Sequence, residues 1–157
     1  MPFKNFSLWR GRLPHWRADD VTYYVQFSHR RPFSPEECGA LLVALMRGEG
    51  SKVNFEIIAA LPERTQMILR VSEAAREGFE FADFIEAAKS KTSKKVMKRT
   101  GERFPPLYQE SYDRIIRDES EYEEFWLQIL NGPVDAELVE DPGEWPGFWA
   151  LDEPRTP

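Results

Sequence analysis

The sequence predicts an α+β fold, a ferredoxin-like (split βαβ) antiparallel sheet with helices packed on one face. Segments rich in β-branched and aromatic residues, typical of strands, alternate with segments whose apolar residues recur every three or four positions, as in helices. Two of the strand segments are separated only by a short turn, which indicates an antiparallel hairpin. The resulting order of strand, helix, strand, strand, helix, strand and helix is that of a split βαβ domain.

Local signals predict the first strand and the first helix. Residues 21–27 (VTYYVQF) carry β-branched and aromatic side chains, which are typical of a strand. Ser34 then stands at an N-cap position, Pro35 follows as the first helical residue, and Glu37 lies three residues after the cap. This pattern predicts a helix that begins after Ser34 and runs to about Arg47.

The middle of the chain supplies the hairpin and a second helix. Residues 53–61 and 65–71 predict two strands joined by a short turn. Apolar residues at three- and four-residue steps predict a helix over 81–100, with Gly101 at its end.

The last third is predicted to hold a short strand at 107–109 and a third helix over about 120–130, ended by Gly132 and the proline after it. Residues 141–157 contain four prolines and no repeat, so an irregular C-terminal tail is expected there. We therefore expect a single domain over 1–157, with its core at about 12–140.

Composition limits the class of protein. The 157 residues suit one domain, and a hydrophobic content of 41% argues against disorder. No apolar run approaches the roughly 18 residues that a membrane span needs, and the first residues lack the apolar stretch of a signal peptide, so a cytoplasmic protein is expected. Cys38 is the only cysteine, which rules out an intrachain disulfide or a multi-cysteine zinc site.

The net charge of -6 conceals an uneven distribution. Residues 1–31 hold six basic and two acidic side chains, and residues 89–103 hold seven basic and one acidic. From residue 118 onward there are twelve acidic side chains and one basic. The two basic segments can meet a phosphate backbone while the acidic end faces away from it, which favours a nucleic-acid partner.

Three stretches carry a resemblance to a known family. They are RLPHW at 12–16, YQESYDRIIRDE at 108–119 and ILNGPV at 129–134. In order and spacing the chain resembles the REP-associated tyrosine transposases, relatives of small insertion-sequence transposases, from about Leu13 to Trp149. The resemblance implies the palm-like sheet of an HUH transposase. It also implies cleavage of single-stranded DNA by a tyrosine hydroxyl, with a divalent metal held by a His-hydrophobic-His pair.

The residues that would carry this chemistry are replaced. The two histidine positions correspond to Arg64 and Gln66, and five residues before Pro133, where the resemblance implies the catalytic tyrosine, the chain has Gln128. Gly132 stands where the resemblance implies an asparagine. We therefore predict a catalytically inactive site without a metal.

Three functions remain open. The favoured one is a transposase-like DNA-binding protein that has lost cleavage; the second is a protein-protein interaction scaffold without DNA binding. The third is a DNA transposase or nuclease with a relocated active site that requires Mg²⁺ or Mn²⁺. There Tyr122, Tyr108 or Tyr112 substitutes for the nucleophile, and Glu63, Gln66 and acidic residues elsewhere hold the metal. Tyr23, Tyr24 and Phe27 of the first strand are candidates for base stacking, although core packing is expected for at least one face of their strand.

The expected partner is single-stranded or hairpin DNA, with a homodimer possible and no membrane. Arg64 either holds a phosphate bidentately or is a solvated turn residue. The predicted nucleic-acid contacts are Arg12, Arg17, Arg64, Lys91, Lys94, Lys95, Lys98, Arg99 and Arg114.

Overall fold

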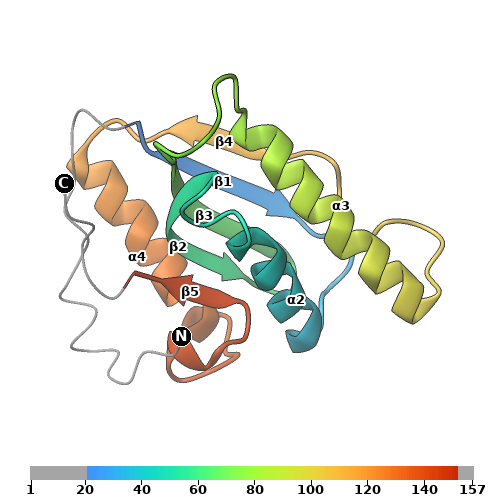
Figure 1. Cartoon of the computed structure of the whole chain (residues 1–157). Helices are drawn as coiled ribbons and strands as arrows, with labels where there is room; N and C mark the ends of the chain where they lie inside the picture. Colours follow the sequence, from blue (N-terminus) through green and yellow to red (C-terminus); the bar gives the residue numbers. More distant parts are fainter. Residues whose placement is uncertain (1–20, 152–157) are drawn as a thin grey trace.

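The computed structural model describes residues 21–151, which form a five-stranded antiparallel sheet of order β4-β1-β3-β2-β5 with three α-helices (Figure 1). The elements are β1 (Tyr23–Ser28), α2 (Pro35–Met46), β2 (Val53–Ala60), β3 (Arg64–Val71), α3 (Phe81–Thr100), β4 (Tyr112–Ile115), α4 (Glu119–Asp135), η1 (Pro142–Glu144) and β5 (Phe148–Ala150). The α+β fold with an antiparallel sheet is confirmed. Among the described residues, no helix is long and apolar enough to cross a membrane.

The predicted helix signals operate as expected. The Ser34 hydroxyl accepts a hydrogen bond from the Glu37 backbone N–H at 3.2 Å, and the Glu37 carboxylate accepts one from the Ser34 N–H at 2.9 Å. This reciprocal pair satisfies two N–H groups that the helix would otherwise leave unpaired. At the end of α3, Gly101 adopts a φ of 79°, a left-handed conformation that glycine reaches without steric cost.

The helices cover both faces of the sheet, which corrects the prediction that they pack on one face. Successive β1 residues point to opposite faces, and the Tyr23 ring packs on Phe81 of α3 with centroids 4.5 Å apart. Tyr24 instead stacks on Phe125 of α4 at 4.1 Å. The reason is that β3 is buried on both sides, from Thr65 through Leu69, so each face needs its own cover.

The strand after α3 lies later in the chain than predicted. Of the predicted segment 107–109, only Leu107 makes a sheet contact, an isolated bridge to His29, whereas β4 starts at Tyr112. Lys89 holds the intervening chain on α3 by bonds to the Glu110 carbonyl and the Ser111 hydroxyl. The segment therefore leaves β1 before it rejoins the sheet.

The end of the chain is more regular than predicted. Helix α4 continues to Asp135, with Pro133 inside it, because the loss of one N–H donor does not stop the last turn. Residues within the expected irregular tail form η1 and β5, and β5 adds to the edge of β2. The Trp145 indole N–H donates to the Ala60 carbonyl at 2.7 Å and fastens this segment to the sheet. Residues 152–157 lie outside the described residues.

Candidate nucleic-acid interface

Arg64 and Gln66 occupy the start of β3 and share the face of the sheet that α4 covers. Two residues separated by one along a strand point the same way. Gln66 donates a hydrogen bond to the Tyr24 hydroxyl at 2.7 Å, and Tyr24 stacks on Phe125 of α4, which identifies that face. The positions that the resemblance assigns to the metal ligands therefore converge, as the alternation in the sequence predicts.

A buried hydrogen-bond chain fills this position. Gln66 is 1% exposed, and its amide donates to the Tyr24 hydroxyl, which in turn donates to the Gln26 side-chain carbonyl at 2.7 Å. Burial raises the pKa of Tyr24, although the Gln66 hydrogen bond and the charge of Arg64 oppose the shift. The phenol therefore stays protonated near neutral pH and is a poor nucleophile.

The same region offers no group of metal ligands. Within residues 21–151, no three His, Cys, Asp or Glu side chains are placed to hold a metal ion together. Arg64 is exposed and brings a positive charge to the position that the resemblance gives to a ligand. A guanidinium there favours an anion such as a phosphate over a cation.

Gln128 borders this site. Phe125, Gln128 and Gly132 are spaced by three and four residues and so lie along one flank of α4. Phe125 rests on Tyr24, and a Cβ added to Gly132 would lie 3.3 Å from Leu61 at the β2–β3 turn. Gln128 lies between these two anchors along α4 and is exposed.

Tyr122, the possible substitute nucleophile, lies beneath α4. Its side chain is 3% exposed, its ring stacks on Trp126, and its hydroxyl is 3.4 Å from a Glu56 carboxylate oxygen. A phosphodiester does not reach this hydroxyl while α4 is packed on the sheet. The base-stacking role expected of Tyr24 and Phe27 also conflicts with their burial, at 3% and 2% exposure, and the Tyr23 ring is packed on Phe81.

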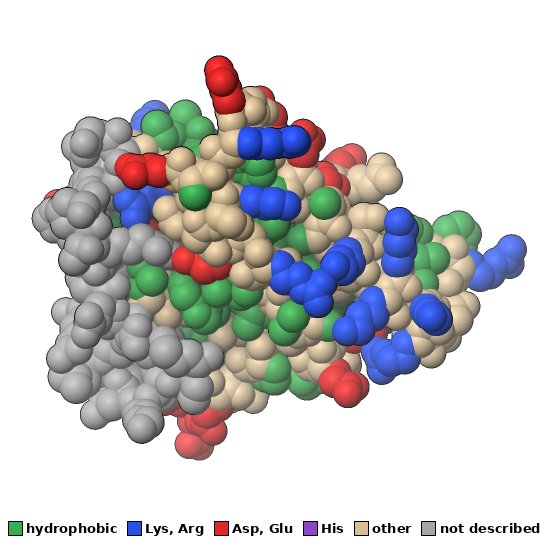
Figure 2. Space-filling model, in the orientation of Figure 1, with side chains coloured by type: hydrophobic (Ala, Val, Ile, Leu, Met, Phe, Trp, Pro, Cys, Tyr) green, Lys and Arg blue, Asp and Glu red, His purple; other side chains and the backbone are tan. Residues whose placement is uncertain are grey.

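Four lysines of α3 form an exposed basic face. Figure 2 shows Lys and Arg side chains gathered over this helix. We call these four residues the α3 lysine face: Lys91, Lys94, Lys95 and Lys98. All four side chains are exposed, and none makes an ion pair within residues 21–151. Exposed acidic side chains lie instead on α4, at Glu119, Glu123 and Glu124. The sheet thus separates a basic helix from an acidic one.

Other predicted contacts are engaged within the protein. Arg99 pairs with Glu37 at 2.9 Å, and Arg114 pairs with Glu121 at 2.7 Å. The Arg114 guanidinium also lies 5.7 Å from the centre of the Phe125 ring. Arg12 and Arg17 belong to residues 1–20, outside the described part of the chain.

Lys89, which the sequence groups with the other lysines, is buried. Its side chain is 3% exposed, and its ammonium bonds to Glu86 at 2.9 Å and to the Ser111 hydroxyl at 3.0 Å. Burial lowers its pKa, opposed by the hydrogen bond and charge of Glu86. Helical spacing was the available signal, because Lys89 lies four residues after Ile85 and three before Thr92, both buried. Its ammonium also lies 4.6 Å from the centre of the Phe27 ring.

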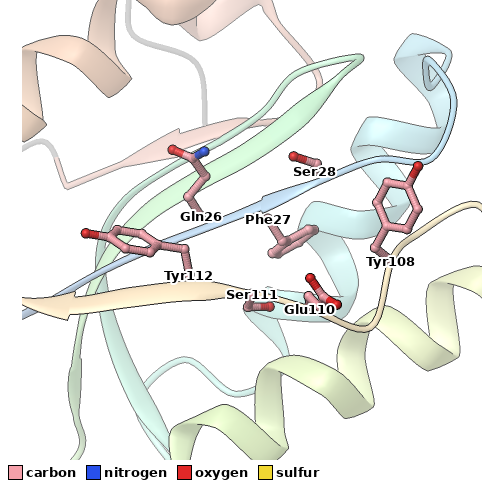
Figure 3. A pocket seen from close by; sticks show the side chains of 7 residues that line it. All are labelled: Gln26, Phe27, Ser28, Tyr108, Glu110, Ser111 and Tyr112. Carbon is pink, nitrogen blue, oxygen red and sulfur yellow. The ribbon is translucent and has the colours of Figure 1, made fainter.

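A hollow beside β1 was not foreseen from the sequence. It encloses about 370 Å³ and is lined by residues of β1 and of the segment that leads into β4: Gln26, Phe27, Ser28, Tyr108, Glu110, Ser111 and Tyr112 (Figure 3). The one signal in the sequence was the pair of tyrosines, Tyr108 and Tyr112, on either side of residues 109–111. The hollow itself depends on how β1 and the segment that leads into β4 separate.

The comparisons with known proteins agree with this architecture. Neither a protein-family model nor a curated protein sequence matches the chain. The solved structure of a REP-associated tyrosine transposase bound to a REP hairpin is similar, with a TM-score of 0.56 and 14% sequence identity. The match covers 80% of this chain and 76% of the transposase chain. The protein therefore has the fold of an HUH transposase, like the REP-associated tyrosine transposase that it matches.

Proposed function

We propose that the protein is a transposase-like protein that binds single-stranded or hairpin DNA and no longer cleaves it. The observation that carries the proposal is the α3 lysine face, four exposed ammonium groups without an acidic partner among the described residues, on a transposase fold. Such groups attract phosphates and release counterions on binding. The acidic α4, on the other side of the sheet, orients DNA toward α3 by repulsion.

Arg64 extends this surface around one end of the sheet. Arg99, in the last turn of α3, pairs with Glu37 at the start of α2, which follows β1. Ser28, the last residue of β1, is the cross-strand partner of Arg64. The end of α3 and the start of β3 therefore lie at the same end of the sheet, and a hairpin crossing it meets both Lys98 and Arg64.

Fluorescence anisotropy tests DNA binding. We expect a labelled hairpin to bind more tightly than an unstructured oligonucleotide of equal length, in a salt-sensitive and metal-independent manner. The stoichiometry of the titration distinguishes one bound chain from a homodimer. Absence of binding at low salt would refute the proposal and favour the scaffold function. A DNA-binding role is consistent with the cytoplasmic location that the sequence predicts.

Loss of cleavage is tested by restoring the replaced groups. We expect the unmodified protein to leave single-stranded DNA intact with Mg²⁺ or Mn²⁺, because Arg64, Gln66 and Gln128 stand where the resemblance implies the metal ligands and the nucleophile. The triple variant Arg64→His, Gln66→His and Gln128→Tyr supplies them, and is the first in which metal-dependent nicking is expected. A tyrosine-DNA adduct formed by the unmodified protein would instead demonstrate a relocated active site.

A further inference from the structure

The hollow beside β1 exists because the pairing of β1 with its edge neighbour is interrupted. Gln26 pairs with Tyr112 of β4, and three residues later His29 bridges Leu107. Between these contacts, two residues of β1 face four residues, 108–111, so the backbone ladder cannot continue. The longer segment moves away from β1 and leaves the space of about 370 Å³.

The interruption is built into the fold by buried contacts on both sides. Leu107 is 4% exposed and holds one end of the segment in the core. At the other end, the Lys89 ammonium bonds to the Glu110 carbonyl at 3.1 Å and to the Ser111 hydroxyl at 3.0 Å. The hollow is therefore shaped before any ligand arrives, which lowers the cost of ordering it on binding.

Two exposed aromatic rings stand at the ends of the hollow. Tyr108 is 49% exposed and Tyr112 is 56% exposed, and Figure 3 shows Gln26 and Ser28 between them. A large aromatic ring that stays half exposed beside a formed hollow offers its face to a planar ligand. Base stacking on such rings is a general way to hold single-stranded DNA.

The polar groups of the hollow suit a base rather than a phosphate. No Lys or Arg lines it, whereas Glu110 does, and a carboxylate repels a phosphate and accepts hydrogen bonds from base N–H groups. The Gln26 carbonyl already accepts from Tyr24, so its amide N–H groups are the ones left to donate. Donor and acceptor together match the mixed edge of a nucleobase.

A site for the attached phosphate lies next to the hollow. Ser28 lines it and is the cross-strand partner of Arg64, so both side chains stand on the same face of the sheet. Arg64 is exposed, and a guanidinium binds phosphate oxygens in a bidentate manner.

We propose that this hollow holds one unpaired base of the bound DNA, stacked on Tyr108 or Tyr112, with its phosphate on Arg64. The inference rests on the proposed function, because the base is that of a DNA strand already bound. In this arrangement Arg64, which stands where the resemblance implies a metal ligand, holds the phosphate of the bound nucleotide.

A comparison of matched hairpins tests the inference. One set carries a single unpaired nucleotide at the 5′ or the 3′ end, and the other carries an abasic residue there. Of the two hairpins with an unpaired base, at the 5′ or the 3′ end, we consider the one that binds more tightly. We expect it to bind the unmodified protein roughly 5- to 150-fold more tightly than the matching abasic hairpin, the range that stacking of one base supplies.

Variants assign this difference to the hollow. We expect the double variant Tyr108→Ala and Tyr112→Ala to bind both hairpins as the unmodified protein binds the abasic one, and Tyr→Phe at both positions to restore the difference. Phe104→Ala is the matched control, because Phe104 is 64% exposed and does not line the hollow. Circular dichroism confirms folding of each variant.

The outcomes separate the two proposals. Equal binding of base-bearing and abasic hairpins by the unmodified protein overturns the base site but leaves hairpin binding standing. Equal weakening of both hairpins in the tyrosine variant also overturns it, because the rings then act without the base. If no hairpin binds at all, both the proposed function and the base site are wrong.

Discussion

Replacing the four lysines of the α3 lysine face with alanine should weaken DNA binding and reduce the dependence of the affinity on salt concentration. Lys91, Lys94, Lys95 and Lys98 are exposed and make no ion pair within residues 21–151, so alanine removes no described salt bridge. Alanine also has the higher helix propensity, and the variant is therefore expected to keep α3 intact. What is lost is four positive charges on one face of the molecule.

The expected size follows from counterion release. Each neutralised phosphate contributes about 0.9 to the slope of log affinity against log salt, so four lysines contribute about 3.6. Between 50 and 200 mM salt, a slope difference of about 3.6 corresponds to roughly 150-fold in affinity. The unmodified protein should lose that much more affinity over this range than the alanine variant.

Anisotropy titrations of one hairpin at four or five salt concentrations measure both slopes. The variant with arginine at the same four positions should retain the original slope, because charge is preserved. Arg76→Ala is a second control, since Arg76 is exposed in the connection between β3 and α3 and not on the α3 lysine face. Equal slopes for the unmodified protein and the alanine variant would show that α3 does not contact phosphates, and the reasoning would fail.

Three further predictions concern the fold. Gly147→Ala should lower the free energy of unfolding by about 1–3 kcal/mol in urea titrations, since a Cβ there would lie 2.3 Å from a β2 carbonyl oxygen; an unchanged midpoint would contradict this. Burial lowers the pKa of His29 to about 4 from 6.5, and the Arg31 hydrogen bond lowers that of Glu37 to about 2 from 4.5. The unfolded chain therefore binds protons that the folded chain does not, and stability falls as pH drops through both pH ranges. Glu37→Gln should reduce the fall in the lower range in denaturation curves, where Glu102, whose pKa Arg31 also lowers, still contributes. Lys89→Ala should lower the melting temperature without changing the salt slope, because its ammonium bonds inside the protein; a slope reduced by about 0.9 would place Lys89 on DNA.

The parts of the fold that local chemistry controls were predictable. The capping pair of Ser34 and Glu37 needs only a spacing of three residues, and Gly101 ends α3 because of its own backbone freedom. The hairpin of β2 and β3 required only a short turn between two apolar strands. Each of these features involves residues close together in the chain, so a single stretch of sequence contains its whole cause.

The candidate site was predictable in part for the same reason. Strand alternation put Arg64 and Gln66 on one face, and helical spacing put the lysines of α3 on its surface. Lys89 lies on the buried face of α3 by the same spacing, but the partners of its ammonium at residues 110 and 111 are more than twenty positions away and were not predictable. The hydrogen-bond chain through Gln66 was equally hidden, because its partner Tyr24 is 42 residues distant.

By itself, the sequence determined the order of the elements, the signals that start and stop its helices, and the uneven distribution of charge. The tertiary structure alone decided that α4 covers the second face, that β5 joins the edge of β2, and that β1 and its neighbour part to form the hollow. The addition of β5 rests on contacts such as that between Trp145 and Ala60, which are 85 residues apart. The hollow rests on the bridge between His29 and Leu107 and on the bonds of Lys89 to residues 110 and 111. No local period encodes such contacts, because they arise only when distant apolar surfaces are buried together and their polar groups must find partners.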